Sequence, residues 1–266
     1  MAGTDSSQDI KFQKPCIILN EVQLPENVGM VLRAMLNFGF KNLRLVNPKV
    51  TLPNKKTISS SAGAYDIIGK YIKTFNSLEE CIEDIECLYA TSVRKRDLDS
   101  FVDDPRNTMK KISKNVNDAN AIGFLFGPEK AGLKNSDLAL ANMVISIPTN
   151  TAFGSLNLAM SVNLICYEWY LSNNNDNNNT HHYHEKDIAN KKEVSFFSNR
   201  LVEILMNTNF FTNIKEQEKL INNLKNIFFK NNLTNKELRI LHGVITILKK
   251  IKNIIDNCVK TSILQV

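Results

Sequence analysis

The chain lacks any long hydrophobic run. No apolar stretch in its 266 residues reaches the roughly 18–20 residues that a membrane-spanning helix needs. Residues 1–9 contain neither a basic region nor an apolar core, so they do not resemble a secretory signal peptide. The sequence therefore argues against a membrane protein, and we expect a cytoplasmic location with no membrane partner.

The chain also lacks paired cysteines. Its five cysteines are an odd number and contain no Cys-x-x-Cys pair, which argues against both a disulfide framework and a zinc site. We expect reduced and mostly buried thiols, because a free cysteine behaves as a small hydrophobic residue. A histidine cluster at 181–184 follows an Asn-rich run and is interpreted as part of a solvated segment, so no metal site is expected.

The glycine-rich fingerprint of dinucleotide-binding folds is missing as well. The first apolar run, Cys16–Leu19, is followed by Asn20-Glu21-Val22-Gln23 and not by a Gly-x-Gly-x-x-Gly turn. This difference argues against a Rossmann-type cofactor site.

Three loop motifs stand out instead. They are residues 20–29, which run on to Arg33; residues 126–133; and residues 147–148 followed by 154–162. Each places Gly, Pro, Asn or Ser between a strand-like apolar run and a helix-like amphipathic run. Because α/β proteins bind ligands in loops at strand ends, the three motifs predict one composite site.

The spacing of apolar residues predicts an α/β fold. Val28, Val31, Leu32 and Met35 repeat at helical spacing, and a second helix is expected from about Ser155 to Tyr170. Alternating strands and helices indicate a parallel sheet that is covered on both faces. The predicted strands are 16–19, 42–46, 87–91, 121–126 and 143–147.

The chain divides into four expected parts. These are a disordered N-terminus at 1–13, an α/β domain at 14–170, an Asn- and His-rich linker at 171–195 and a helical domain at 196–266. Three apolar stripes and a capping box at Thr234–Glu237 predict a small helical bundle in the last part. The stripes are Leu201, Ile204 and Leu205; Leu220, Leu224, Ile227 and Phe228; and Leu238, Leu241, Ile245, Leu248 and Ile255.

Positive charge is concentrated in this helical part. Residues 196–266 hold eleven Lys and Arg against five Asp and Glu, an excess equal to the whole chain's net charge of +6. A basic appendage on a neutral body suits a polyanion such as RNA.

Taken together, the three motifs resemble the SpoU (TrmH) group of the SPOUT superfamily, which are RNA ribose 2′-O-methyltransferases. The resemblance covers roughly residues 14–170 and includes all three motifs in the family's order. It implies a trefoil knot near the C-terminal end of the α/β domain, S-adenosylmethionine as cofactor without a metal, and a homodimer. It further implies tRNA as substrate, at the cytidine or uridine that opens the anticodon loop. Two alternatives to this function stay open. The chain could methylate another tRNA position or ribosomal RNA, or it could bind RNA without catalysis.

The resemblance also implies which residues hold the cofactor. Gly127 would let backbone approach it, and Ile147 and Leu156 would flank its adenine. Gly154 and Ser155 would form the tight turn between them, although relatives more often have serine at the first of these positions. Thr91, Ser92 and Val93 would end an earlier strand that faces the same pocket.

Five residues are candidates for catalysis. Arg33 lies off the buried stripe of its helix, and the resemblance ties this arginine to activation of the 2′-hydroxyl. A guanidinium is almost always protonated, so we expect it to orient a phosphate or stabilise an alkoxide and not to act as a base. Asn27 precedes the helix as a predicted N-cap that can also lie beside the substrate. Glu129, Ser155 and Asn157 complete the set, and each of them is a candidate for either a catalytic or a structural role.

Overall fold

The computed structural model describes residues 9–92, 102–115, 122–174, 187–207, 210 and 214–263. Within these ranges, the side chains of 113–115, 174, 214–215 and 252–263 are not described.

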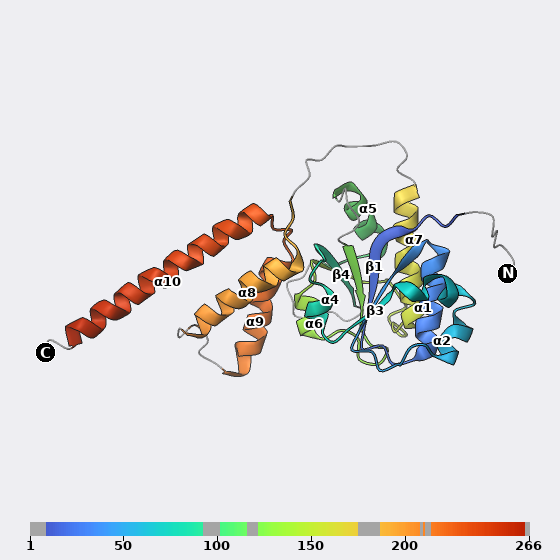
Figure 1. Cartoon of the computed structure of the whole chain (residues 1–266), viewed down its shortest axis with the longest axis horizontal. Helices are drawn as coiled ribbons and strands as arrows, with labels where there is room; N and C mark the ends of the chain where they lie inside the picture. The colour runs from blue at the N-terminus through green and yellow to red at the C-terminus, as the bar shows by residue number, and fades with distance from the viewer. Residues whose placement is uncertain are drawn as a thin grey trace.

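A seven-stranded sheet forms the centre of the molecule, with strand order β3-β2-β1-β6-β4-β7-β5 (Figure 1). Every paired strand is parallel to its neighbour, which confirms the expected parallel α/β fold. The five predicted strands are present as β1, β2, β4, β6 and β7, while the short β3 and β5 at the sheet edges were not predicted. The strands are β1 Gln13–Asn20, β2 Phe40–Val46, β3 Ile72–Phe75, β4 Cys87–Thr91, β5 Val102–Asp103, β6 Ile122–Phe126 and β7 Met143–Ile145.

Helices cover both faces of the sheet, as alternation along β1 demands. Ile17 and Leu19 belong to a hydrophobic cluster with the helices α1, α3, α5 and α7. Cys16 and Ile18 point into a second cluster with α4, α6 and the C-terminal helices. The helices of the α/β part are α1 Pro25–Asn37, α2 Lys55–Ser60, α3 Ala64–Ile68, the 3₁₀ turn η1 Gly69–Tyr71, α4 Leu78–Cys81, α5 Pro105–Asn115, α6 Asn135–Ala139 and α7 Leu158–Asn174.

The C-terminal part contains the helices α8 Lys191–Met206, α9 Ile214–Phe229 and α10 Asn235–Ile263. They are attached to the sheet, because Val194, Phe197 and Phe229 are buried in the second cluster. The predicted capping box is present: the Thr234 backbone N–H donates to the Glu237 carboxylate over 2.8 Å, and the Glu237 N–H donates back to Thr234 over 3.2 Å. Beyond its first turns, α10 projects away from the sheet (Figure 1).

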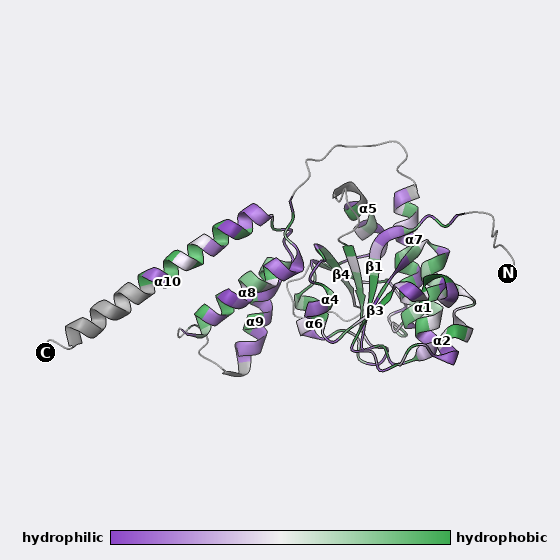
Figure 2. Ribbon diagram, in the orientation of Figure 1, coloured by the Kyte–Doolittle hydropathy of each residue, from purple (hydrophilic) through white to green (hydrophobic). Residues whose placement is uncertain are grey.

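The apolar stripes of these helices are only partly buried. On α10, Leu238 and Ile245 are buried, but Leu248 is 57% exposed. On α9, Leu220 and Ile227 are exposed. Figure 2 shows hydrophobic residues on several sides of these helices. Helical spacing identifies an apolar face, but which residues of that face are covered depends on tertiary packing.

The described residues include no helix that is both long and apolar enough to cross a membrane.

Candidate active site

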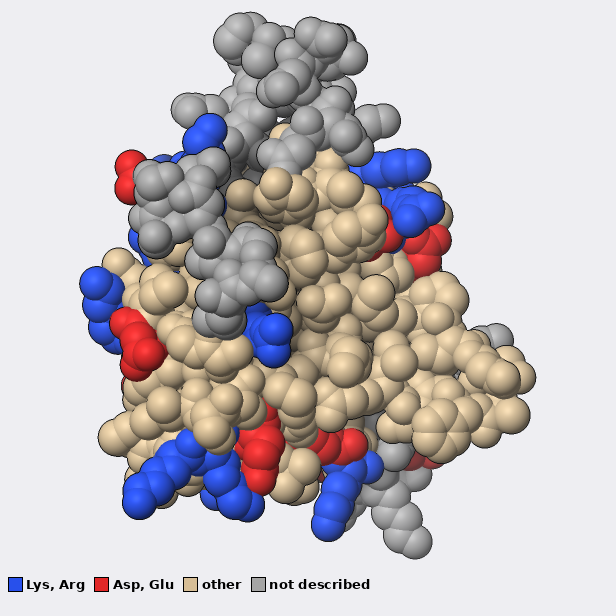
Figure 3. Space-filling view, turned by 90° about the vertical axis from the view of Figure 1, so that its right-hand side faces the viewer, with Lys and Arg blue, Asp and Glu red and all other residues tan. Residues whose placement is uncertain are grey.

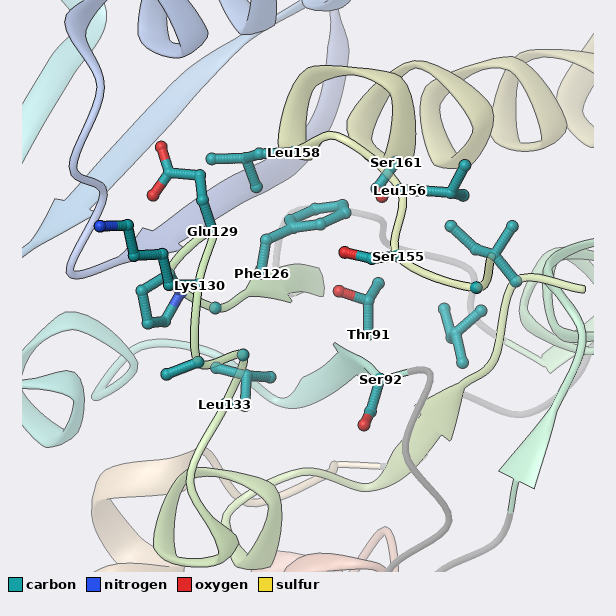
Figure 4. A pocket seen from close by; sticks show the side chains of 17 residues that line it. Thr91, Ser92, Phe126, Glu129, Lys130, Leu133, Ser155, Leu156, Leu158 and Ser161 are labelled. Atoms are coloured by element: carbon teal, nitrogen blue, oxygen red, sulfur yellow. The ribbon is translucent and has the colours of Figure 1, made fainter. Parts of the chain in front are cut away.

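A pocket of about 320 Å³ opens at the carboxyl ends of β6, β4 and β7, which are neighbours in the sheet (Figure 4). It is lined by the end of β4, the loop after β6, the end of β7 and the loop that leads into α7. The second and third sequence motifs thus line one pocket, as expected for loops at strand ends, while no residue of the first motif lines it. Seven of the predicted cofactor residues line it, while Val93 lies outside the described residues. The seven are Thr91, Ser92, Gly127, Ile147, Gly154, Ser155 and Leu156.

The loop after β6 folds back so closely that it needs glycine at its start. A Cβ at Gly127 would lie 2.4 Å from the backbone nitrogen of Leu133. The turn closes with a hydrogen bond from the Gly132 N–H to the Pro128 carbonyl over 2.9 Å, and Gly132 has a positive φ of 66°. Backbone therefore forms this wall of the pocket.

Glu129 ties the second motif to the first. Its carboxylate accepts hydrogen bonds from the backbone N–H groups of Gln23 and Leu24 over 3.1 and 3.2 Å. It also accepts one from the side-chain amide of Asn27 over 2.8 Å. The negative charge lies at the N-terminal end of α1, where the helix dipole favours it. Among the described residues, Glu129 makes no hydrogen bond or ion pair with Arg33.

Asn27 links Glu129 of the second motif to Asn157 of the third motif. Its side-chain oxygen accepts from the Asn157 amide over 3.0 Å. Asn157 in turn caps α7, because its side-chain oxygen accepts from the N–H of Ala159 over 2.8 Å. The predicted N-cap role of Asn27 was wrong: Leu24 is the N-cap of α1, and Asn27 is buried inside the first turn. Pro25 accounts for the earlier start, since proline fits the first helical position.

Arg33 lies on the exposed side of α1, as its place on the helical wheel predicted. It does not line the pocket. Its guanidinium makes no hydrogen bond or ion pair with any residue that the structure describes, so it is available to an external group. The rest of α1 is fixed firmly: a Cβ at Gly29 would lie 2.0 Å from the Ser60 hydroxyl oxygen of α2.

Ser155 differs from Glu129, Asn27 and Asn157 in its bonding. Its side chain is directed into the pocket, close to Thr91 and Phe126 (Figure 4). It is exposed and has no bonding partner among the described residues. Thr91, in contrast, donates to the Leu125 carbonyl over 3.1 Å. A free hydroxyl in a pocket can bind a polar group of a ligand.

Several pocket residues were not predicted as site residues. Most of them lie inside the second and third motifs, so closeness to the motif glycines was the signal that could have found them. Lys130 is the only cation among them. The additional residues are Phe126, Pro128, Lys130, Ala131, Gly132, Leu133, Ile145, Leu158 and Ser161. No group of three or more His, Cys, Asp or Glu suited to a metal ion occurs in the described ranges, which exclude 181–186.

Comparison with known proteins places this site in a family. The sequence model of the SpoU rRNA Methylase family matches residues 14–167, more than half of the chain. The chain belongs to this family. The match contains all three motifs, so the site is that of a SpoU methylase.

Two curated relatives and one solved structure extend the similarity beyond the methylase domain. The tRNA (cytidine/uridine-2'-O-)-methyltransferase TrmJ of Photorhabdus laumondii is 32% identical, with 88% of this chain and 96% of that protein covered. An uncharacterized tRNA/rRNA methyltransferase of Haemophilus influenzae is 30% identical, over 88% and 94%. The crystal structure of TrmJ from Z. mobilis ZM4 has a TM-score of 0.78 at 34% identity, covering 88% of this chain and 99% of that one.

Proposed function

We propose that this SpoU methylase transfers a methyl group from S-adenosylmethionine to the ribose 2′-oxygen of a cytidine or uridine in tRNA. The observation that carries the proposal is that the second and third motifs line one pocket, and that the first motif is tied to both by the Glu129, Asn27 and Asn157 hydrogen bonds. The names of the TrmJ relatives support tRNA and the two pyrimidine nucleotides. By the resemblance, the target is the pyrimidine that opens the anticodon loop.

The pocket suits S-adenosylmethionine, which would supply an electrophilic methyl group when bound. Ile147 is almost fully buried and Leu156 half-buried, and both offer an apolar slot for an adenine. The tight turn at Gly127 and Gly132 presents backbone, without a side chain at Gly127, along one wall of the pocket. Ser155 supplies a free hydroxyl for a ribose or amino-acid group. We propose that the chain passes through the family's knot around this pocket.

We propose that Arg33 acts on the RNA and not on the cofactor. Its unpaired guanidinium lies outside the pocket, on the helix whose N-terminal end Glu129 binds. A fixed positive charge there can orient a phosphate and stabilise the oxygen that loses its proton, which is a term of several kcal/mol in other enzymes. Glu129, Asn27 and Asn157 hold the elements in register for this role.

We also propose a homodimer through the outer face of α7. Met160 is 57% exposed, and Leu164, Tyr167 and Tyr170 are each exposed by more than a third. Phe38 at the end of α1 packs its ring against both tyrosines. The side of the molecule that carries α1 and α7 has a broad uncharged surface (Figure 3). Light scattering is expected to give twice the 30.1 kDa of one chain; a value near one chain at micromolar concentration contradicts it.

One experiment tests the reaction itself. The protein is incubated with labelled S-adenosylmethionine and either unmodified total tRNA or ribosomal RNA, and the methylated nucleotide is mapped by mass spectrometry. We expect label on the 2′-oxygen of one anticodon-loop pyrimidine. Label on ribosomal RNA alone overturns the substrate, and loss of both label and calorimetric cofactor binding overturns the enzyme.

A further inference from the structure

A second cavity lies in the C-terminal helices, between α8 and α10. Its volume is about 350 Å³, and none of the residues that line it belongs to the methylase pocket. It is lined by Phe196, Asn199, Arg200, Glu203, Ile204 and Lys249.

Arg200 is held in one orientation by neutral groups. One guanidinium nitrogen lies 3.0 Å from Nδ1 of His242, and the other donates to the Thr246 hydroxyl over 2.8 Å. Burial, and then the charge of Arg200, lower the pKa of His242, so this ring is a neutral acceptor near pH 7. Neither partner carries a negative charge, and the structure describes no ion pair for Arg200. The cavity therefore contains a fixed cation whose hydrogen-bond partners are neutral.

An aromatic face and a second cation lie beside it. Phe196 is 67% exposed, although its ring also contacts His242 at a centroid distance of 5.6 Å. Lys249 is exposed and has no partner among the described residues. Glu203 is the one acidic lining residue, so the cavity's formal charge is +1. An exposed aromatic ring that shares a cavity with two cations is the pattern of single-stranded nucleic-acid sites, where bases stack and phosphates are neutralised.

We infer that this cavity binds an unpaired nucleotide of the RNA substrate, with its base on Phe196 and its phosphate at Arg200 and Lys249. The inference deepens the proposed function, on which its choice of RNA rests. The cavity lies in the part of the chain that holds the basic excess, which suits a polyanion. The cavity is a docking site and takes no part in methyl transfer.

Matched variants of the full-length protein test the inference. Binding of unmodified tRNA is measured by fluorescence anisotropy at several salt concentrations, without cofactor. Lys249→Ala is expected to lower the slope of log affinity against log salt by about 0.7–0.9, the value for one phosphate contact. Lys250→Ala is the control, because it removes the same charge from the next residue, outside the cavity. It should leave the slope unchanged.

The base contact has its own variants. Phe196→Ala is expected to weaken binding roughly 5- to 150-fold without changing the salt slope, and Phe196→Tyr should keep the affinity. Glu203→Gln should strengthen binding. Melting temperatures and calorimetric cofactor binding show whether each variant is folded. Equal slopes for the Lys249 and Lys250 variants, or wild-type affinity for Phe196→Ala, overturn the inference.

Failure of the docking site and failure of the proposed function give different results. If the wild-type protein methylates tRNA while all cavity variants bind it normally, the docking site is wrong and the function stands. If the variants weaken RNA binding as expected but no methylation occurs, the function is wrong and the site stands.

Discussion

Replacing Asn27 by aspartate probes the link between the three motifs. The Asn27 amide donates to Glu129 over 2.8 Å, so Asn27→Asp sets two carboxylates against each other at a buried site. Two unit charges at this distance repel by about 6 kcal/mol at an effective dielectric constant of about 20. That energy equals roughly four pKa units, so one carboxyl of the pair should stay protonated up to about pH 8. When protonated, it can donate the hydrogen bond that asparagine made.

The sign of the pH effect follows from the raised pKa. The folded variant holds a proton that the unfolded chain releases near pH 4, so its stability falls as pH rises between these values. We expect the stability deficit relative to wild type, measured by urea unfolding, to grow between pH 5 and pH 8 by at most about 4 kcal/mol. Asn27→Ala is the control, because its loss should not vary with pH. A deficit for the aspartate variant that is equally flat would refute the Asn27–Glu129 bond.

Three further predictions test other parts of the molecule. Arg33→Ala should lower the methylation rate by two orders of magnitude or more while calorimetry shows unchanged cofactor affinity; a variant that retains over about a tenth of the rate contradicts the role. Gly29→Ala should lower the melting temperature markedly, because the added Cβ would collide with the Ser60 hydroxyl. Adding Ser60→Ala should recover little of the loss, because the same Cβ would also lie 2.2 Å from the Thr57 carbonyl oxygen. Burial lowers the pKa of Lys191 to about 7 in the folded protein. Between pH 7 and pH 10 the unfolded chain therefore binds more protons than the folded protein does. The free energy of unfolding of the wild type should rise with pH over this range. Urea unfolding of Lys191→Met should lack this gain, and the exposed Lys192→Met should keep it.

The central fold could be predicted because its strands are buried on both faces. Such strands are continuous apolar runs, and Cys87–Thr91 was predicted with the bounds that the structure has. The helices α2, α3 and α4 were not predicted, because four to six residues are too few to establish a helical period. Which residues of the α9 stripe are buried could not be predicted, because burial depends on the neighbours that the helix meets in the fold.

The site was predictable as a region but not as a set of contacts. Glycines and prolines between strands and helices marked the three loops, and the second and third of these loops line the pocket. The partners of Glu129 could not be predicted, because Gln23 and Leu24 offer backbone groups that have no side-chain signature. The cavity residues Phe196 and Arg200 carried no motif at all, and only the packing of α8 against α10 brings them to Lys249 and His242.

The hydrogen bonds divide the motif residues into two groups. Glu129 binds three donors of the first motif, and Asn157 is occupied by the start of α7 and by Asn27. A substrate that used these groups would have to break bonds that fix α1 and α7, each of which contributes about 0.5–3 kcal/mol. Ser155 and Arg33 can bind a ligand without any such loss. We therefore expect chemistry to depend on Ser155 and Arg33, while the other three motif residues set the positions of the helices that carry them.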